Sequence, residues 1–85
     1  MPTARRGGAG GAVIGDTLYV IGGRNRVGDY IRTVEAYTPA NTWVTKDSLA
    51  EARSGFGAVA SNGVIHAVGG RNSTGLLATN ETYRP

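Results

Sequence analysis

The stretch V-I-G-G-R-N at Val20–Asn25 returns as V-G-G-R-N at Val68–Asn72. The first glycines of the two copies, at positions 22 and 69, lie 47 residues apart. Two glycines followed by an arginine are compatible with a loop that binds phosphate, and also with a marker that closes each unit of a repeated structure. The residues around the two copies decide between these interpretations.

Other residues recur at nearly the same interval. E-A-Y at Glu35–Tyr37 matches E-T-Y at Glu81–Tyr83, 46 residues later, and P-T-A-R at 2–5 resembles A-E-A-R at 50–53, 48 residues later. Self-similarity at this period is typical of repeat architectures, and single-residue insertions in loops explain the drift in offset. The chain therefore holds a little less than two repeats. The predicted units are residues 1–48 and an incomplete second repeat at 49–85.

The pattern within each repeat indicates short antiparallel strands. Runs of β-branched and aromatic residues alternate with turn signals, and no segment shows a helical period over a useful length. Gly15-Asp16 and Asn62-Gly63 are typical of the tight turns that join hairpin strands. The second strand of each repeat, called strand b, is apolar on both sides, so we expect both of its faces to be covered. The expected strands, in the order a, b, c, d and then a, b, c, are 10–14, 17–21, 31–37, 42–46, 55–60, 64–68 and 78–83.

The order arginine, apolar strand, double glycine, Glu-x-Tyr and tryptophan resembles the Kelch repeat, and the resemblance covers nearly the whole chain. It implies an all-β fold, a partial Kelch β-propeller of about two four-stranded blades, with the second lacking its last strand. A closed propeller has about 4–8 blades. We therefore expect a piece of a propeller, or a protomer that completes a ring with other copies. The residues that mark the repeat are Gly22, Gly23, Tyr37, Trp43, Gly69, Gly70 and Tyr83.

The repeat markers have expected structural roles in such an array. The double glycines end strand b, adopt positive φ and let neighbouring blades approach closely. The rings of Tyr37, Tyr83 and Trp43 are expected between blades, where the OH or NH group binds a backbone partner.

Two glutamates recur inside strand c, at Glu35 and Glu81. We expect them to pair with recurring arginines, namely Arg53 and either Arg5 or Arg6. This structural pairing is favoured over a ligand role, because most recurring polar residues in repeat arrays hold the array together.

The composition leaves little material for catalytic or metal chemistry. The 85 residues include no cysteine and a single histidine, His66, which lies within an apolar strand. Disulfides and a His/Cys metal centre are therefore excluded, and no nucleophilic triad or acid–base pair stands out. A phosphate-binding loop is rejected too, since no helix follows either glycine pair. We expect no catalytic residue, no metal and no cofactor.

Charge and hydropathy patterns limit the partners. The net charge is +3, lysine is almost absent, and no aromatic residues interleave with the basic loop residues, so nucleic acid is not favoured. The N-terminus has no apolar run after its arginines, and no stretch approaches the ~20 apolar residues of a membrane span. We expect no membrane partner, with the cytoplasm as the default location.

The arginines gather on one predicted face. In a four-stranded meander, the b–c loops and the segments that lead from strand d to the next strand a emerge on the same side. A rim of guanidinium groups there favours an acidic peptide or another multivalent anion. The arginines assigned to this face are Arg5, Arg6, Arg24, Arg26, Arg53 and Arg71, with Arg32 close to it.

The resemblance favours the same face. Kelch-like adaptors of cullin ubiquitin ligases bind acidic peptide segments there, in at least one case through an Arg-Asn pair after the double glycine, and Arg24-Asn25 and Arg71-Asn72 match that position. The alternative interpretation is that both asparagines cap their turns and the arginines are merely solvated. The predicted contact residues are Arg5, Arg24, Asn25, Arg53, Arg71 and Asn72.

These observations favour a non-catalytic protein-binding module or propeller fragment that binds acidic peptide or protein segments. An alternative is a fragment of a larger Kelch-propeller enzyme, of the sugar epimerase or oxidase type, with its catalytic residues outside these 85. A third is a structural homo-oligomer, in which three blade pairs form a six-bladed ring.

Overall fold

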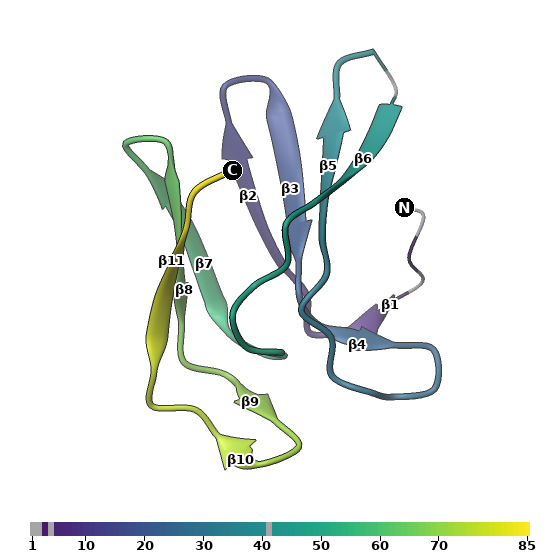
Figure 1. Ribbon diagram of the computed structural model, residues 1–85, viewed down its shortest axis with the longest axis vertical. Coiled ribbons are helices and arrows are strands. Elements are labelled where there is room, and N and C mark those ends of the chain that lie inside the picture. The colour runs from purple at the N-terminus through teal and green to yellow at the C-terminus, as the bar shows by residue number, and fades with distance from the viewer. Residues whose placement is uncertain (1–2, 4, 41) are drawn as a thin grey trace.

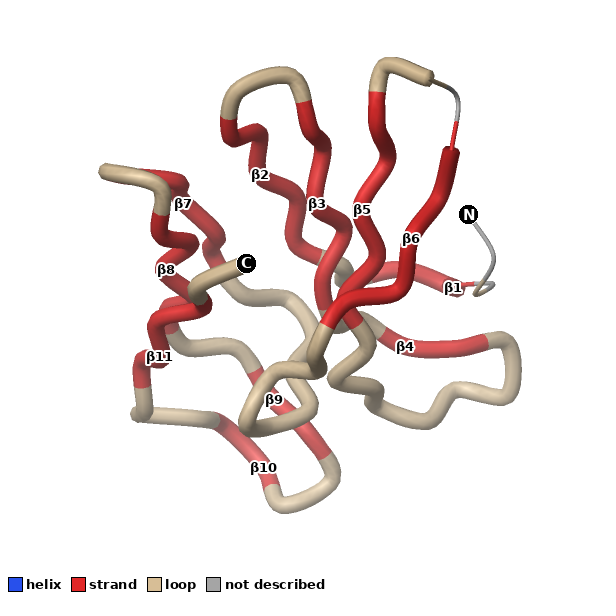
Figure 2. The backbone as a smooth tube through the Cα atoms, turned by 45° about the horizontal axis from the view of Figure 1, so that its top comes forward, coloured by secondary structure: helices blue, strands red, loops and turns tan. Residues whose placement is uncertain are grey.

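The computed structural model of the protein describes residues 3, 5–40 and 42–85, with the side chain of Arg6 outside this part. Within it the fold is all-β, as predicted, and the strands form two main antiparallel sheets and two short ribbons (Figure 1). Figure 2 shows the two main sheets standing side by side. The described residues contain no helix that could cross a membrane.

The first sheet, called blade 1, is a meander in which each strand pairs with the next one along the chain. Gly15 has a φ of 60°, which lets the chain turn tightly after the first strand. The predicted four-stranded unit is thus confirmed. Its strands are β2 (Gly10–Ile14), β3 (Thr17–Ile21), β5 (Val34–Thr38) and β6 (Thr42–Lys46).

The second sheet, called blade 2, has three strands in the order β11-β8-β7. Asn62 and Gly63, with φ angles of 52° and 74°, form the tight turn that their sequence predicts. Within the described residues no strand pairs with the outer edge of β11, so blade 2 lacks strand d, as expected. Its strands are β7 (Gly57–Ser61), β8 (Val64–Val68) and β11 (Asn80–Tyr83).

Three strands begin later than predicted: β5 at residue 34 rather than 31, β7 at 57 rather than 55, and β11 at 80 rather than 78. In blade 1 the cause is visible in the hydrogen bonds. The Ile31 N–H donates to the Gly23 carbonyl at 3.0 Å, and the Arg32 carbonyl accepts from the Leu49 N–H at 2.8 Å. Bonds to distant loops therefore take this backbone out of the sheet.

Two short ribbons, which were not predicted, lie at one end of the sheets. β1 (Arg5–Gly7) pairs with β4 (Arg24–Asn25), and β9 (Arg71–Asn72) pairs with β10 (Gly75–Leu76). A bridge also joins Ser54 to β9. The b–c loops and d–a segments therefore emerge together, at the lower end in Figure 1, and the hairpin turns lie at the upper end. We call the lower end the ribbon end.

Blade 2 packs against one face of blade 1, and this contact forms the core. Ile21 and Val34 of blade 1 meet Ile65 of blade 2, and all three are fully buried. Leu49, from the segment between the blades, fills the same cluster. Burying one large aliphatic side chain stabilises a fold by about 1.5–3 kcal/mol, so the inter-blade contact contributes several kcal/mol of favourable burial.

The glycines of blade 1 are required by this contact. A Cβ on Gly22 would lie 2.8 Å from the Arg53 carbonyl and 3.0 Å from the Phe56 ring. A Cβ on Gly10 would lie 2.7 Å from the same ring and 3.0 Å from Ala58. The predicted roles are thus confirmed at Gly22, which has a φ of 61° and also allows close approach. The other repeat glycines, Gly23, Gly69 and Gly70, have φ angles of 97°, 70° and 92°.

Only one of the three marker rings lies between the blades. Tyr83 is buried beside Tyr19, and its OH donates to the Asp47 carbonyl, as predicted. Tyr37 and Trp43 lie on the other face of blade 1 and contact each other, with ring centroids 4.9 Å apart. The inter-blade position of these two rings stays a prediction, because they lie on the face of blade 1 that points away from blade 2.

The outer faces of both blades remain exposed in the described residues. Val13 and Leu18 on blade 1 are 60% and 37% exposed, and Val59 and Val68 on blade 2 are 60% and 51% exposed. Within the described residues each blade has one neighbouring blade, so the prediction that strand b is covered on both faces is not confirmed.

The burial of Tyr83 predicts a loss of stability at high pH. Desolvation, assisted by the Asp47 carboxylate and by Tyr19, raises the pKa of Tyr83 above its usual value of 10.0. From pH 10 upward the unfolded chain releases this proton while the folded chain retains it, so stability falls until the pH passes the folded pKa. Urea unfolding at pH 8 and pH 11 should show a larger loss for the wild type than for Tyr83→Phe. Equal losses of stability in the wild type and in Tyr83→Phe would contradict this prediction.

Candidate binding surface

Arg5 is anchored inside blade 1. Its guanidinium forms an ion pair with Glu35 and donates to the carbonyls of Gly22 at 2.8 Å and Thr33 at 3.1 Å. The side chains of Arg5 and Glu35 are 2% and 0% exposed. Glu35 also accepts from the N–H and OH of Thr3, both at 3.0 Å. The arginine thus ties the end of strand b to the start of strand c.

Arg53 repeats this arrangement in blade 2. It pairs with Glu81 at 3.0 Å and donates to the carbonyls of Gly69 at 2.7 Å and Thr79 at 2.8 Å. It also lies 3.5 Å from Glu51. Each contact on Gly69, Thr79 and Glu81 has its counterpart around Arg5, one repeat earlier. The predicted structural pairing of Arg5 and Arg53 with Glu35 and Glu81 is therefore confirmed.

The same contacts correct the prediction of a ligand role for these two arginines. Arg53 is 0% exposed and Arg5 is almost as fully buried, and both guanidinium groups are occupied by carboxylates and carbonyls. A ligand at the surface cannot reach them in this structure, so they leave the contact set. Arg6 lies outside the part whose side chains are described.

The two asparagines shape their loops. Asn25 Oδ1 accepts from the N–H groups of Val27 and Asp29, at 3.2 and 3.0 Å. Asn72 Oδ1 accepts from the N–H and OH of Thr74, and Asn72 Nδ2 donates to the Ala52 carbonyl at 3.0 Å. The turn-capping interpretation is therefore confirmed for both, and it makes them positioning residues for the arginines beside them.

Arg24 is held within its own loop. Its Nε donates to the Gly28 carbonyl at 3.0 Å, and its guanidinium lies 5.0 Å from the centroid of the Tyr30 ring. The side chain is half-buried. A cation stacked on an aromatic face keeps its charge and presents one edge outward, so Arg24 supports the surface around Tyr30.

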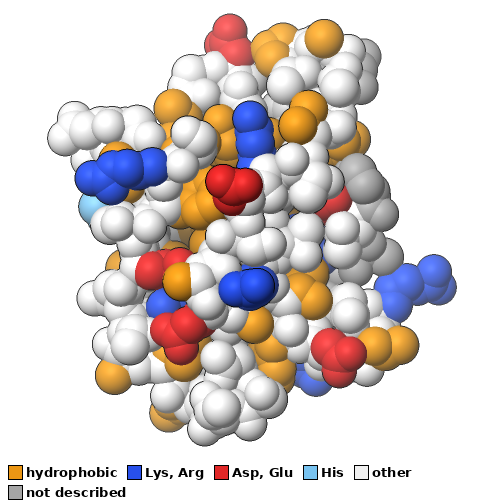
Figure 3. Space-filling model, in the orientation of Figure 1, with side chains coloured by type: hydrophobic (Ala, Val, Ile, Leu, Met, Phe, Trp, Pro, Cys, Tyr) orange, Lys and Arg blue, Asp and Glu red, His pale blue; other side chains and the backbone are white. Residues whose placement is uncertain are grey.

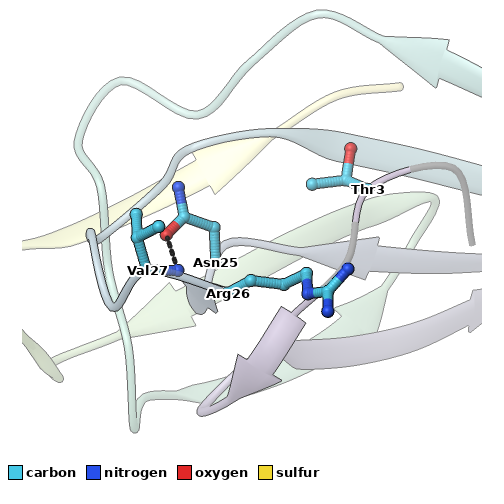
Figure 4. Close-up of a pocket in the computed structure, with 4 residues that line it drawn as sticks. All are labelled: Thr3, Asn25, Arg26 and Val27. Carbon is cyan, nitrogen blue, oxygen red and sulfur yellow. Dashed lines mark hydrogen bonds between the residues drawn. The ribbon is translucent and has the colours of Figure 1, made fainter.

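Arg26 and Arg71 are both exposed at the ribbon end. Figure 4 shows the Arg26 side chain extending from the loop, beside a pocket that Thr3, Asn25 and Val27 also line. Arg32, near the same end, is exposed too and donates to the Leu49 carbonyl at 3.4 Å. The cationic surface is thus smaller than predicted.

A groove separates the b–c loops of the two blades and has a volume of about 460 Å³. Tyr30 lines one wall of the groove, and the Arg24 guanidinium stacks on its ring. Asn72 lines the wall formed by the other loop, and Arg71 precedes it in the chain. The groove carries an acidic group as well, because Asp29 is exposed in its lining. We call it the inter-loop groove, and its lining residues are Gly28, Asp29, Tyr30, Ala52, Asn72 and Ser73.

Basic and acidic side chains are mixed over the surface. On the face drawn in Figure 3, the described Lys and Arg side chains alternate with Asp and Glu, and no wide area of one sign appears. Within the described residues no group of three or more His, Cys, Asp or Glu side chains could hold a metal ion. The inter-loop groove can bind a polar segment through hydrogen bonds and through its aromatic wall, and the loops that form it also carry exposed arginines.

Sequence reasoning missed Tyr30 and Ser73 as residues of this surface. Tyr30 has no aromatic counterpart one repeat later, where Leu77 stands, so a search for repeated residues passes over it. A different signal was present, because a lone tyrosine next to Gly28-Asp29 in a polar loop is typical of interaction surfaces.

The Kelch motif matches residues 5–49 of the chain. Kelch-like protein 13 of Mus musculus is 42% identical over 75 residues, which is 82% of this chain and 12% of that protein. Alpha-scruin of Limulus polyphemus is 40% identical over 62 residues, 72% of this chain and 7% of that protein. Kelch-like protein 31 of Homo sapiens is 37% identical over 79 residues, 85% of this chain and 12% of that protein. The chain therefore spans only about an eighth, or less, of the length of these relatives.

Proposed function

The chain belongs to the Kelch-repeat family, and on that premise we propose that it is a non-catalytic protein-binding module. Its ligand is an acidic peptide segment, which lies across the ribbon end with its side chains in the inter-loop groove. The observation that supports the proposal is a groove with an aromatic wall between the two b–c loops, each of which also carries an exposed arginine, Arg26 or Arg71.

The exposed arginines act mainly through charge. Both are free to adjust to a carboxylate, and an arginine can hold it with two parallel hydrogen bonds. Arg24 and Asn72 act differently, because the first braces Tyr30 and the second fixes the opposite wall through Ala52. The predicted contact set therefore becomes Arg71 and Arg26 for the carboxylates, with Arg24, Asn25 and Asn72 as supports.

Asp29 adds a repulsive element to the same groove. An exposed carboxylate there disfavours a segment that is acidic at every position. The geometry therefore favours a segment whose acidic residues lie outside the groove, with a neutral hydrogen-bonding side chain over Asp29.

Binding of a fluorescein-labelled peptide with glycine-flanked glutamates tests the proposal by fluorescence anisotropy. Arg26→Gln and Arg71→Gln should each weaken binding about 2–5-fold, the effect of an exposed charge pair. Asp29→Asn should strengthen it by a similar factor. Affinity should fall as salt rises.

Arg84→Gln is the matched control, because Arg84 is an exposed arginine that follows β11 as the chain leaves the ribbon end (Figure 1). It should leave the affinity unchanged. If Arg84→Gln weakens binding as much as Arg71→Gln does, the affinity depends only on the net charge of the protein, and the site is wrongly placed. Unchanged binding in the Arg26/Arg71 double variant would also refute the proposal.

A further inference from the structure

The two outer sheet faces are not alike, and each corresponds to one side of the inter-blade contact. Residues paired across antiparallel strands share a face. The pairing register therefore assigns each residue to one of the two sides of its blade. We call the outer side of blade 1 the leading face; it comprises Val13, Leu18, Val20, Tyr37 and Trp43. We call the outer side of blade 2 the trailing face; it comprises Gly57, Val59, His66, Val68 and Thr82.

The leading face repeats the surface by which blade 2 contacts blade 1. Leu18 and Val20 precede Ile65 and Ala67 by one repeat of 47 residues, and Ile65 and Ala67 are both 0% exposed. Tyr37 precedes the buried Tyr83 by 46 residues. The leading face therefore carries the residue types that pack against a neighbouring blade, and the second sheet of the described residues lies on the opposite side of blade 1.

The trailing face repeats the surface of blade 1 that receives blade 2. Val59 and Val68 follow Ala12 and Ile21 by 47 residues, and Ala12 and Ile21 are buried. Val59 and Val68 themselves are more than half exposed.

Gly57 is the most informative residue of this face. Gly10, its counterpart in blade 1, must be glycine because Phe56 lies on it. A Cβ on Gly57 would meet no atom within 4 Å among the described residues, and Gly57 is not among the positive-φ glycines. Neither the backbone nor a contact with the described residues requires glycine there, so the position suits the close approach of another surface.

We propose that a second copy of this chain docks head to tail, with its leading face on the trailing face of the first. Between the two blades of the described residues, a leading-type face packs on a trailing-type face, and a second copy would present both types again. The contact buries no unpaired charge, since Arg5 and Glu35 beside the leading face already pair with each other. Such a contact is heterologous, so it closes into a ring or continues as a chain. A closed ring of 4–8 blades would hold about two to four copies.

Complementary charge variants provide the test, read by light scattering and sedimentation. At high concentration the mean particle mass of the wild type should exceed 8.8 kDa, the mass of one chain. Val13→Glu blocks the leading face and Val59→Glu blocks the trailing face, so each alone should remain a monomer. Mixed together they should form a 1:1 dimer and no larger species, because each supplies the intact face that the other lacks.

Val27→Glu is the matched control. Val27 is an even more exposed valine at the ribbon end, outside the residues of both faces, and its substitution should leave assembly unchanged. Circular dichroism should show the same β spectrum for all three variants. A wild type that stays monomeric at about 1 mM overturns the proposal, and so does a mixture that remains monomeric while both variants are folded. Assembly by Val13→Glu alone would also overturn it, since that result requires contact between two trailing faces.

A gain-of-contact variant tests the register. Ala9 stands 47 residues before Phe56, and in a docked copy it would lie over Gly57. Ala9→Phe should therefore lower the concentration of half-assembly about tenfold. Val59→Glu added to Ala9→Phe should abolish the gain. A gain that survives Val59→Glu would show that the new ring acts elsewhere and would contradict the proposed contact.

Discussion

Replacing Arg53 by alanine is expected to lower the free energy of unfolding by about 3–5 kcal/mol, which is the range for breaking a buried ion pair by removing one partner. The side chain is 0% exposed and donates to Glu81, Gly69 and Thr79. Its loss leaves a carboxylate and two carbonyls without their charged donor. The free energy of unfolding of a typical domain is only about 5–15 kcal/mol. The variant should therefore be largely unfolded at 25 °C, and circular dichroism and urea titration measure this.

Two further variants separate the buried role from the loss of charge alone. Arg32→Ala removes an exposed arginine that makes one long bond to Leu49, and it should change stability by less than about 0.5 kcal/mol. Arg53→Met combined with Glu81→Met should recover part of the loss, because neither partner is then left as a buried charge. If Arg53→Ala behaves like Arg32→Ala, the ion pair does not hold the blade together.

The Arg53 case also shows how far recurrence in sequence can predict structure. The pairing of Arg53 with Glu81 could be predicted, because both residues recur with Arg5 and Glu35 at the repeat interval. The proposed ligand role of the same arginine was wrong. A sequence assigns a residue to a segment, but it does not say whether the side chain points into the blade or out of it.

The same reasoning explains which strand boundaries were predicted. Strands β3, β6 and β8 match their apolar patterns to the residue, because hairpin turns and glycine pairs close to them in sequence fix their ends. Strand β5 begins three residues late because Gly23 and Leu49 bind the backbone ahead of it. Those partners are distant in sequence, and no local pattern reports them.

A matched pair of glycine substitutions should show how strongly the blade contact constrains the chain. Gly10 and Gly57 occupy the same position of two successive repeats, and each begins the first strand of its blade. Alanine adds the same methyl group at both. The difference between the two variants therefore measures the neighbouring blade and not the strand.

Gly10→Ala is expected to destabilise the fold by about 2–3 kcal/mol, within the range for overpacking a core. The new methyl group would lie 2.7 Å from the Phe56 ring, and Phe56 is also confined by Gly22 and Gly70. Gly57→Ala meets open space in the monomer, and it should stabilise the fold by about 0.5–1 kcal/mol, because glycine within a strand is unfavourable. Urea unfolding at low protein concentration, where the chain is monomeric, gives both values.

A double-variant cycle assigns the loss to the ring. In the Phe56→Ala background the ring that the new methyl group would contact is absent. The loss of stability caused by Gly10→Ala should therefore fall to about zero. The coupling between residues in contact reaches about 0.5–3 kcal/mol, and a value near the upper end is expected because Gly10 and Phe56 touch directly. Equal effects of Gly10→Ala and Gly57→Ala in the wild-type background would mean that the blades do not pack through this ring, and the head-to-tail contact derived from the same position would lose its basis.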